Sequence, residues 1–496
     1  MKKHVIAVLV LLFALLTVLP AQANVEQPAM STPVSQTQAA EPKYVFMFIG
    51  DGMSHVQINA AQVLKGNKEK GNLSLGKLTF TQFPAVGLQT TYDATSFCPD
   101  SASTATSLSS GFKTHSGVIG LGIDKQQVGK TIAEQVKQQK DWKVGIVSTV
   151  TLNHATPAAY YAHVPSRNSY YDIGLQMADS GFDYFAGGAI SKAEDGGNKS
   201  IYTILEEKGY LVTDSAQEIL SLNAAAGKVY AQSPRLQDSG SMPYAMDMDA
   251  DDLSLAQLVG KGIELLDNEN GFFMMVESGK IDWACHANDA AAEINDLLAF
   301  DAAIDEALAF AQAHPQETLI VVTGDHETGG MTIGYAGTGY NTAFDILENQ
   351  KLSYVAFDEK FNARLKADSL FSFSEALDLV ASDFGLVAPG KTASNKALVL
   401  SDLEYAKLEQ AFTQAKLPSS QRSVDDQYKL LYGGYNPFSI TLTHILNNKA
   451  GIGWTSYAHT GTPVSVYAYG SGSERFSGSY DNTEIYHKLA DLVGLV

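Results

Sequence analysis

Between residues 98 and 111 the chain is dense in small and hydroxyl-bearing side chains that follow a proline. Pro99 is disfavoured inside a helix, so the sequence predicts a helix that begins just after it, with Asp100 or Ser101 as the N-cap. The first turn of a helix carries unpaired backbone N–H groups that attract anions such as phosphate. Ser101 would place its hydroxyl at this end. A serine nucleophile for phosphoryl transfer is one interpretation, and an ordinary capped helix rich in Ser and Thr is the other.

Side chains that bind metal ions follow several apolar runs. Asp51 comes directly after the first run, Glu277 after the third, and Thr156 soon after the second. Asp325 and His326 follow the fourth run. If these runs are parallel strands, their carboxyl ends meet at one edge of a sheet and the ligands gather there. A single carboxylate after a strand is commonplace as a helix cap, but four such loops make coincidence a poor explanation.

A closer spacing follows the third run, where Asp282 and His286 stand four residues apart. On a helical turn, residues at this spacing project to the same side, so the pair can bind one ion. His459 can complete that site, while Asp325 and His326 offer the same mixture of oxygen and nitrogen for another. Zinc accepts mixed carboxylate and imidazole ligands, whereas magnesium prefers oxygen.

The elements that must position these residues alternate along the chain. Continuous apolar runs are typical of strands buried on both faces of a parallel sheet. The segments between them repeat apolar residues every three or four positions, as amphipathic helices do. The alternation predicts an α/β fold, a three-layer sandwich with a mostly parallel central sheet and helices on both faces. The runs cover residues 44–49, 144–147, 272–276 and 319–322, and the helical segments cover 130–140, 255–266 and 289–310.

Size and charge limit the function classes. The 496 residues, of which 45% are hydrophobic, are enough to bury a large core without disulfide bonds. The formal net charge of −20 argues against nucleic acid as a specific partner. An anionic substrate would therefore need local positive charge from metal ions or an arginine. The sequence leaves open whether the two cysteines, Cys98 and Cys285, are bonded or free.

The N-terminus has the pattern of a secretory signal peptide. Lys2 and Lys3 precede an apolar run over residues 5–19, and Ala21-Gln22-Ala23 supplies a small-residue cleavage pattern. The run is shorter than the about 20 residues that span a bilayer, so a membrane anchor is disfavoured. We predict cleavage after Ala23, periplasmic or secreted localisation, and no membrane association after cleavage.

The rest of the chain divides into a leader and one large domain. Residues 24–42 are rich in Gln, Ala, Ser, Thr and Pro without an apolar period, which predicts a flexible leader. The strand–helix pattern begins after the leader and loosens between about residues 330 and 453. We therefore predict a catalytic domain over residues 43–496 with an insertion at about 330–453.

Six segments carry a family resemblance. They are Phe48-Ile49-Gly50-Asp51-Gly52-Met53; Asp100-Ser101-Ala102 with Thr104-Ala105-Thr106; His154-Ala155-Thr156-Pro157 with Ala162-His163-Val164 and Ser166-Arg167; residues 277–286; Thr323-Gly324-Asp325-His326; and His459-Thr460-Gly461. They occur in the same order as in the alkaline phosphatase family, which the chain resembles over most of its length. The resemblance implies an exported, metal-dependent phosphoric monoester hydrolase that acts on small-molecule phosphate monoesters as a homodimer.

The resemblance also implies two zinc ions and one magnesium ion per subunit. One zinc ion would activate the water of the second step, and the other would lower the pKa of the nucleophilic hydroxyl. The implied ligands are Asp282, His286 and His459 for the first zinc ion, Asp51, Asp325 and His326 for the second, and Asp51, Thr156 and Glu277 for magnesium.

The implied reaction begins with in-line attack by Ser101 and passes through a phosphoserine that water then hydrolyses. Arg167 is similar to the family's bidentate clamp on phosphate oxygens. Two positions depart from the best-known bacterial pattern, because His154 stands where some members have Asp and Trp283 where some have Lys. The first change would weaken the surroundings of magnesium. The second removes a positive charge near the phosphate and would speed its release.

Two other functions stay open from the sequence: a phosphodiesterase of the same superfamily and a non-catalytic protein that binds zinc or phosphate. Phosphodiesterase relatives usually lack the metal site of Thr156 and Glu277 and the Arg167 clamp, so these residues favour a monoesterase. A carrier needs no aligned hydroxyl, so Ser101 argues against that alternative.

Overall fold

The structure is a computed structural model that describes residues 41–70, 73–126 and 129–495. The predicted signal peptide, and all of the predicted leader except its last two residues, lie outside these ranges. None of the helices within them combines the length and the apolar composition that a membrane-spanning helix needs.

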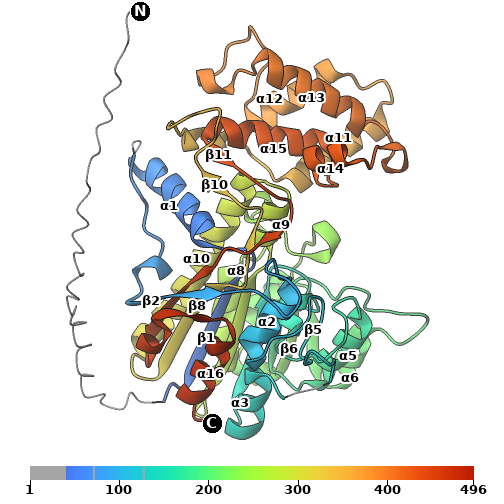
Figure 1. Ribbon diagram of the computed structural model, residues 1–496. Helices are drawn as coiled ribbons and strands as arrows, with labels where there is room; N and C mark the ends of the chain where they lie inside the picture. Colours follow the sequence, from blue (N-terminus) through green and yellow to red (C-terminus); the bar gives the residue numbers. More distant parts are fainter. Residues whose placement is uncertain (1–40, 71–72, 127–128, 496) are drawn as a thin grey trace, which may run out of the picture. The chain divides into compact units, whose positions relative to one another are not determined.

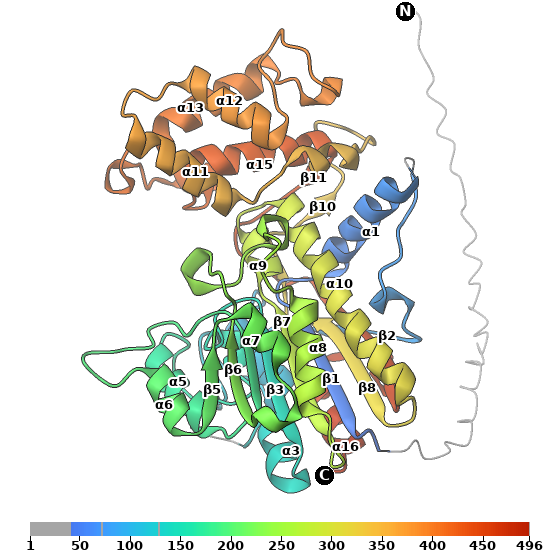
Figure 2. The same cartoon turned by 180° about the vertical axis from the view of Figure 1, so that it is seen from behind.

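Ten strands of the described residues form one sheet, in the order β14-β2-β13-β8-β1-β7-β3-β4-β6-β5. Neighbouring strands are parallel except at β13, which runs antiparallel to β2 and to β8. The predicted α/β class with a mostly parallel central sheet is therefore confirmed (Figures 1 and 2). The strands are β1 (Tyr44–Gly50), β2 (Ala85–Thr90), β3 (Lys143–Ser148), β4 (Tyr184–Gly187), β5 (Tyr210–Thr213), β6 (Lys228–Gln232), β7 (Phe272–Ser278), β8 (Thr318–Gly324), β13 (Val464–Gly470) and β14 (Gly478–Asp481).

The three central strands end at the same level. Ile49 of β1 pairs with Glu277 of β7 and with Thr323 of β8, and the following residues pair in the same way. The loops that carry Asp51 and Asp325 therefore begin beside the end of β7. Glu277 lies inside β7 rather than after it, because the hydrogen-bonded ladder with β1 continues to Ser278.

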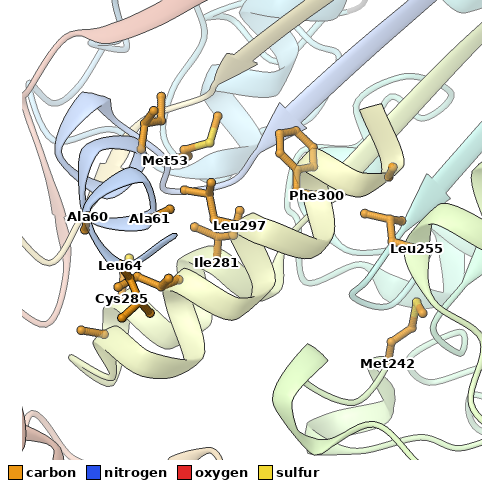
Figure 3. Close-up of a cluster of buried hydrophobic side chains, with 14 of the residues drawn as sticks. Met53, Ala60, Ala61, Leu64, Met242, Leu255, Ile281, Cys285, Leu297 and Phe300 are labelled. Atoms are coloured by element: carbon orange, nitrogen blue, oxygen red, sulfur yellow. The ribbon is translucent and has the colours of Figure 1, made fainter. Parts of the chain in front are cut away.

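Alternate residues of β1 face two hydrophobic clusters. Phe46 and Phe48 belong to a cluster with buried residues of α1, α8 and α10, and Val45 and Met47 belong to one with residues of α2, α3, α5 and α16. The two groups of helices cover opposite faces of the sheet (Figures 1 and 2), and Figure 3 shows part of the first cluster. These helices are α1 (His55–Lys70), α2 (Ser101–Ser110), α3 (Ile132–Lys140), α5 (Tyr170–Asp179), α8 (Leu255–Leu266), α10 (Ala290–Ala313) and α16 (Thr483–Leu492).

Capping residues set where the helices begin. The predicted helix over residues 255–266 matches α8, whose N-cap Ser254 forms a capping box with Gln257. The other two predicted starts are slightly early, because Thr131 and Asp289 are the N-caps of α3 and α10. The shorter elements include α4 (Ala155–Ala158), α6 (Ile201–Glu207), α7 (Ala216–Ser221), α9 (Lys280–His286), β9 (Glu327–Thr328) and β12 (His459–Thr460).

A helical region stands between the short strands β10 (Thr332–Ile333) and β11 (Ile452–Gly453), which pair antiparallel. Its centre is aromatic: the Phe361 ring lies 5.0 Å from the Phe438 ring and 6.0 Å from the Phe412 ring. These phenylalanines belong to the same hydrophobic cluster as Phe46. We call it the η5–α15 region. It comprises η5 (Phe344–Asn349), α11 (Tyr354–Ala367), α12 (Phe373–Phe384), η6 (Lys396–Leu398), α13 (Asp402–Ala415), η7 (Ser419–Gln421), α14 (Asp426–Tyr432) and α15 (Pro437–Ala450).

Candidate active site

Ser101 is the first residue of α2, as the proline and the small residues predicted. Asp100 caps this helix and accepts a hydrogen bond from the Ser103 N–H at 3.1 Å. The Ser101 Oγ lies 3.1 Å from the His326 Nε2 and donates to the Asp51 Oδ1 at 3.5 Å. The serine is buried, so its hydroxyl faces two of the predicted ligands rather than open solvent.

All ten residues of α2 are buried. Small side chains make this close packing possible, and their hydroxyls bond to nearby carbonyls: the Thr106 Oγ1 donates to the Ala102 carbonyl at 2.7 Å. The Thr104 Oγ1 lies 3.1 Å from the Asp100 carbonyl and also 3.1 Å from the Asp325 Oδ2, as a donor to either oxygen. The helix is thus fastened directly to one of the ligand-bearing loops.

A first ligand group consists of Asp282, His286 and His459, whose ligand atoms lie within 4.8 Å of one another. The His286 Nε2 is 3.1 Å from the His459 Nε2 and 3.3 Å from the Asp282 Oδ2. Backbone carbonyls orient both rings, because the His286 Nδ1 lies 2.6 Å from the Tyr457 carbonyl and the His459 Nδ1 lies 2.5 Å from the Pro99 carbonyl. Such contacts leave Nε2 to bind a metal ion.

A second group combines Asp51, Asp325 and His326. The His326 Nε2 lies 3.3 Å from the Asp51 Oδ1 and 3.3 Å from the Asp325 Oδ2. Asp282 also comes within 4.8 Å of Asp51 and His326, so the first two groups adjoin each other. The Thr328 Oγ1 donates to the Asp282 Oδ1 at 2.5 Å and holds this shared carboxylate in place.

A third group surrounds the other oxygen of Asp51. The Thr156 Oγ1 donates to the Asp51 Oδ2 at 3.3 Å, and Asp51, Glu277 and His154 have ligand atoms within 4.8 Å of one another. Ser148 donates to the Glu277 Oε2. Two buried atoms here have no hydrogen-bond partner, the Glu277 Oε1 and the His154 Nδ1. His154 therefore belongs to the group itself, in addition to the three oxygen ligands that the resemblance implied.

The electrostatics of these groups favour cations. Burial raises the pKa of Asp51 well above its usual range, and repulsion from Asp325 and other carboxylates adds to the shift. Burial likewise raises the pKa of Asp325 to about 7 and the pKa of Glu277 to about 8. A cation relieves such repulsion and gives the two unpartnered atoms a ligand role. The residues present therefore fit bound metal ions.

In the first ligand group, attraction between a carboxylate and imidazoles outweighs the effect of burial on the pKa values. Burial alone would raise the pKa of Asp282, but the imidazoles of His286, His459 and His326 lower it below its usual range. Burial alone would lower the pKa of His286, yet the Asp282 carboxylate raises it to about 9. A metal ion must displace this proton from the imidazole, so metal affinity here should rise with pH.

Arg167 stands at the wall of a cavity of about 530 Å³ that Ser101 also lines. Its Nη1 donates to the Asp100 Oδ2 at 2.9 Å, and its Nη2 lies 3.1 Å from the His154 Nε2, so two contacts fix the plane of the guanidinium. The Trp283 ring lies 5.9 Å from the His154 ring in a T-shaped arrangement. The two positions that depart from the bacterial pattern therefore contact each other beside Arg167.

Four further residues line this cavity and were not predicted: Asp238, Ser239, Tyr354 and Tyr435. Tyr354 begins α11, and Tyr435 lies between α14 and α15. Asp238 and Ser239 have left-handed backbone angles, with φ of 40° and 60°. None of them stands in a recognisable motif or after a predicted strand, so the sequence carried no signal for them.

The two cysteines are free. Cys98 is exposed ahead of α2, and Cys285 is buried in α9. Burial raises the pKa of the Cys285 thiol well above its usual range, so this side chain serves packing rather than chemistry.

Comparison with known proteins agrees with this geometry. The family model for alkaline phosphatase matches residues 42–202 and 183–495. Alkaline phosphatase 3 of Bacillus subtilis is 30% identical over 455 residues, which cover 90% of this chain and 87% of that protein. The crystal structure of a cold-active alkaline phosphatase from the psychrophile Shewanella sp. has a TM-score of 0.75 and 27% identity, covering 91% of this chain and 99% of its own. A mutant TAB5 alkaline phosphatase with magnesium bound in its M3 site has a TM-score of 0.62 and 25% identity, over 92% and 99%.

These matches span nearly all of the described residues. They include the segments that bring Ser101, Arg167 and the three ligand groups to one edge of the sheet. Fold, site geometry and sequence agree, and the chain belongs to the alkaline phosphatase family.

Proposed function

We propose that this phosphomonoesterase acts through a phosphoserine formed on Ser101, with metal ions bound beside it. The observation that carries the proposal is the position of the Ser101 Oγ, 3.1 Å from the His326 Nε2 and 3.5 Å from the Asp51 Oδ1, at the N-terminus of a ten-residue helix. A hydroxyl in this position adjoins groups that hold cations. It also lies at the helix end that stabilises negative charge on phosphate oxygens.

Two zinc ions and one magnesium ion per subunit are the cofactors we propose. When bound, they supply Lewis acidity and offset the negative charge of the phosphate. Three oxygen donors favour magnesium at the third position. The His154 Nδ1 adds a nitrogen donor there, which makes zinc a competitor. The proposed ligands are Asp282, His286 and His459; Asp51, Asp325 and His326; and Asp51, Thr156 and Glu277 with His154.

Arg167 and Ser101 would divide the work on the substrate. The guanidinium, held in plane by Asp100 and His154, would bind two oxygens of the terminal phosphate. The Ser101 Oγ attacks phosphorus opposite the leaving oxygen, the bond to that oxygen breaks, and the proton of Ser101 ends on the departing alcohol. Water then attacks the phosphoserine, its Oγ–P bond breaks, Ser101 regains a proton and inorganic phosphate leaves.

A monoester and a diester of the same phenol test the reaction class. We expect nitrophenyl phosphate to be turned over far faster than bis(nitrophenyl) phosphate, because Arg167 needs two unesterified oxygens of a terminal phosphate. A preference for the diester would make the chain a phosphodiesterase.

Acid quenching during turnover tests the intermediate. Phosphate should be trapped on Ser101 in the wild-type protein and be missing from the Ser101→Ala variant. No trapped phosphate and no turnover in protein reconstituted with zinc and magnesium would mean a non-catalytic binding protein.

Export and assembly are further parts of the proposal. The apolar run after Lys2 and Lys3 and the Ala21-Gln22-Ala23 pattern support cleavage after Ala23 and periplasmic or secreted localisation. The family supports a homodimer, and the loosened pattern between about residues 330 and 453 supports an insertion in a catalytic domain over residues 43–496. N-terminal sequencing of the exported protein tests the cleavage site and the export, and the mass of the protein in solution tests the homodimer.

A further inference from the structure

The cavity beside Ser101 is larger than the phosphate site. Its volume of about 530 Å³ falls in the range of about 300–1,000 Å³ that is usual for pockets holding whole small molecules. Beyond the residues proposed to handle phosphate, its wall consists of Trp283, Tyr354, Tyr435, Asp238 and Ser239. Three rings and a carboxylate therefore surround the space that an ester's alcohol would occupy.

We propose that this wall is a leaving-group subsite for phosphate monoesters whose alcohol carries a planar ring and hydrogen-bond donors, the chemistry of nucleoside 5′-monophosphates. The proposal rests on the phosphomonoesterase function proposed above and names the substrate class of that same cavity. It assigns a role in specificity to two residues of the η5–α15 region, Tyr354 and Tyr435, and to Asp238 of the segment between β6 and α8.

The two tyrosines form a rigid aromatic surface. Tyr354 and Tyr435 meet in a T-shaped pair with ring centroids 5.7 Å apart. Tyr354 also meets the ring of Tyr244 at 5.9 Å, and Tyr435 meets the ring of Tyr457 at 6.4 Å. Tyr354 is only 7% exposed, although it lines the cavity. Rings held in this way lose little conformational entropy when another ring stacks against them.

Carboxylates outside the η5–α15 region fix the start of α11. Asp289, the N-cap of α10, accepts a hydrogen bond from the Tyr354 N–H at 2.9 Å. Asp247 accepts from the Ser353 N–H at 2.8 Å and from the Ser353 Oγ at 2.5 Å. The same Ser353 Oγ caps α11 through the Ala356 N–H at 3.2 Å. Tyr354 is therefore held at the cavity by two carboxylates that lie outside the η5–α15 region.

The polar part of the wall is equally well fixed. Lys280 is fully buried, and its Nζ lies 3.5 Å from the Asp238 Oδ2 and 3.0 Å from the Ser241 Oγ. The same ammonium lies 3.7 Å from the centre of the Tyr244 ring and 4.9 Å from that of the Trp283 ring. One buried cation thus connects the carboxylate and the aromatic side of the subsite. It also balances the charge of Asp238, which leaves the carboxylate as an acceptor for hydroxyl or amino donors rather than an anion repelling phosphate.

This combination discriminates between alcohols. A nucleobase presents a flat face for stacking on tyrosine or tryptophan, and its sugar hydroxyls and amino groups are donors that a carboxylate can accept. Glycerol has donors but no planar face, so it gains nothing from the rings. Both alcohols leave through a primary oxygen, and a difference in their turnover then reports binding of the leaving group rather than its chemistry.

The test compares adenosine 5′-monophosphate with glycerol 3-phosphate in the zinc- and magnesium-loaded enzyme. The measured quantity is the ratio of the two kcat/KM values. We expect Tyr354→Leu and Tyr435→Leu each to lower this ratio by about 2- to 10-fold, the size of one aromatic contact. Tyr435→Phe should keep it, because the ring remains. Asp238→Asn should lower it less, since an amide oxygen still accepts a hydrogen bond.

A matched control lies in the same region. Tyr405 of α13 pairs with Phe373 at 5.2 Å and does not line this cavity, so Tyr405→Leu should keep the wild-type ratio. If Tyr354→Leu fails to fold, the half-buried Tyr435 decides the matter. A ratio that stays at the wild-type value in Tyr435→Leu, whether or not both kcat/KM values fall, would overturn the subsite. A wild-type enzyme that hydrolyses neither ester would instead overturn the proposed function.

Discussion

The sheet edge and the η5–α15 region reach the same cavity in different ways. At the sheet edge, Asp51, Glu277 and Asp325 arrive by register, because β1, β7 and β8 end at one level. In the η5–α15 region, Tyr354 arrives because Asp289 and Asp247 hold the beginning of α11. The first arrangement follows from strand pairing alone, whereas the second depends on a few buried hydrogen bonds between distant segments.

Under the proposed function, the groups for chemistry and the groups for selectivity stand in different parts of this chain. Groups that hold ions need fixed distances, and paired strands supply them with little freedom to vary. Groups that select among alcohols need only a surface of suitable shape, which helices anchored at one end can provide. We therefore expect damage at the sheet edge to abolish turnover and damage to the helix anchor to change stability and preference.

The largest effect should follow Asp51→Asn. Asp51 takes part in two ligand groups, with one oxygen toward His326 and the other toward Thr156. Losing its charge should lower activity at least about 100-fold and lower the metal content of the purified protein. Elemental analysis and kcat/KM are the measurements. The control Asp301→Asn changes a buried carboxyl that lies in none of these groups, and it should keep wild-type metal content. Full metal content in Asp51→Asn would contradict the proposal that Asp51 binds metal ions in two ligand groups.

Replacing Asp289, which holds the start of α11, should produce the second largest effect. Asp289→Ala leaves the Tyr354 N–H without its acceptor, leaves the Gln350 Nε2 with only the Leu352 carbonyl, and removes the N-cap of α10. We expect a loss of about 2–4 kcal/mol in the free energy of unfolding. The ratio of kcat/KM values should fall as well, measured beside urea unfolding. Ser401→Ala removes the N-cap of α13 and should cost about 1 kcal/mol while the ratio stays the same. Identical behaviour of the two variants would show that the contact of Asp289 with the start of α11 adds nothing to the effect of a lost helix cap.

The two regions should also respond differently to alkaline pH. Burial raises the pKa of Asp358 in α11 to about 7, even though the side chains of Ser439 and Asn436 lower it. The stability linked to a raised pKa is complete below the unfolded value of 3.8 and is lost as the pH rises through about 7. Asp358→Asn should therefore gain about 2–3 kcal/mol relative to wild type between pH 5 and pH 9.

Urea unfolding at both pH values measures this gain. Asp426 of α14 has a side chain that is 98% exposed, and Asp426→Asn should follow the wild-type profile. Parallel profiles for Asp358→Asn and wild type would show that Asp358 does not weaken the η5–α15 region at high pH.

The smallest effect concerns product release at the boundary of the two regions. Trp283 lines the cavity beside His154 and brings no charge. Trp283→Lys should tighten competitive inhibition by inorganic phosphate about 3- to 10-fold, because a new ammonium adds a charge-assisted contact in a partly solvated site. Trp283→Met removes the ring without adding charge and should show less tightening. Unchanged inhibition in Trp283→Lys would separate this position from phosphate binding.

The sequence predicted the residues at the sheet edge better than the other residues of the cavity wall. Strand runs, the N-cap before Ser101 and the ligands after strands follow local rules, and the structure places these residues together. The place of His154 in the third ligand group was not predicted, because only the fold brings its imidazole to Asp51 and Glu277. Tyr354, Tyr435 and Asp238 were missed because none of them stands in a motif, and nothing in the local sequence shows which side chains face a cavity. Glu277 was predicted to follow a strand that ends at Val276, but β7 continues to Ser278, since an apolar run does not reveal how far the hydrogen-bonded ladder extends.

The buried helix α2 has a consequence for how activity is lost. Because all ten of its residues are buried, the amide protons of this helix should exchange with deuterium only when the packing around the helix opens. Local fraying cannot carry the nucleophile away from its neighbours. Heat should therefore inactivate this protein in the same cooperative step that melts its sheet, with no partly active species beforehand.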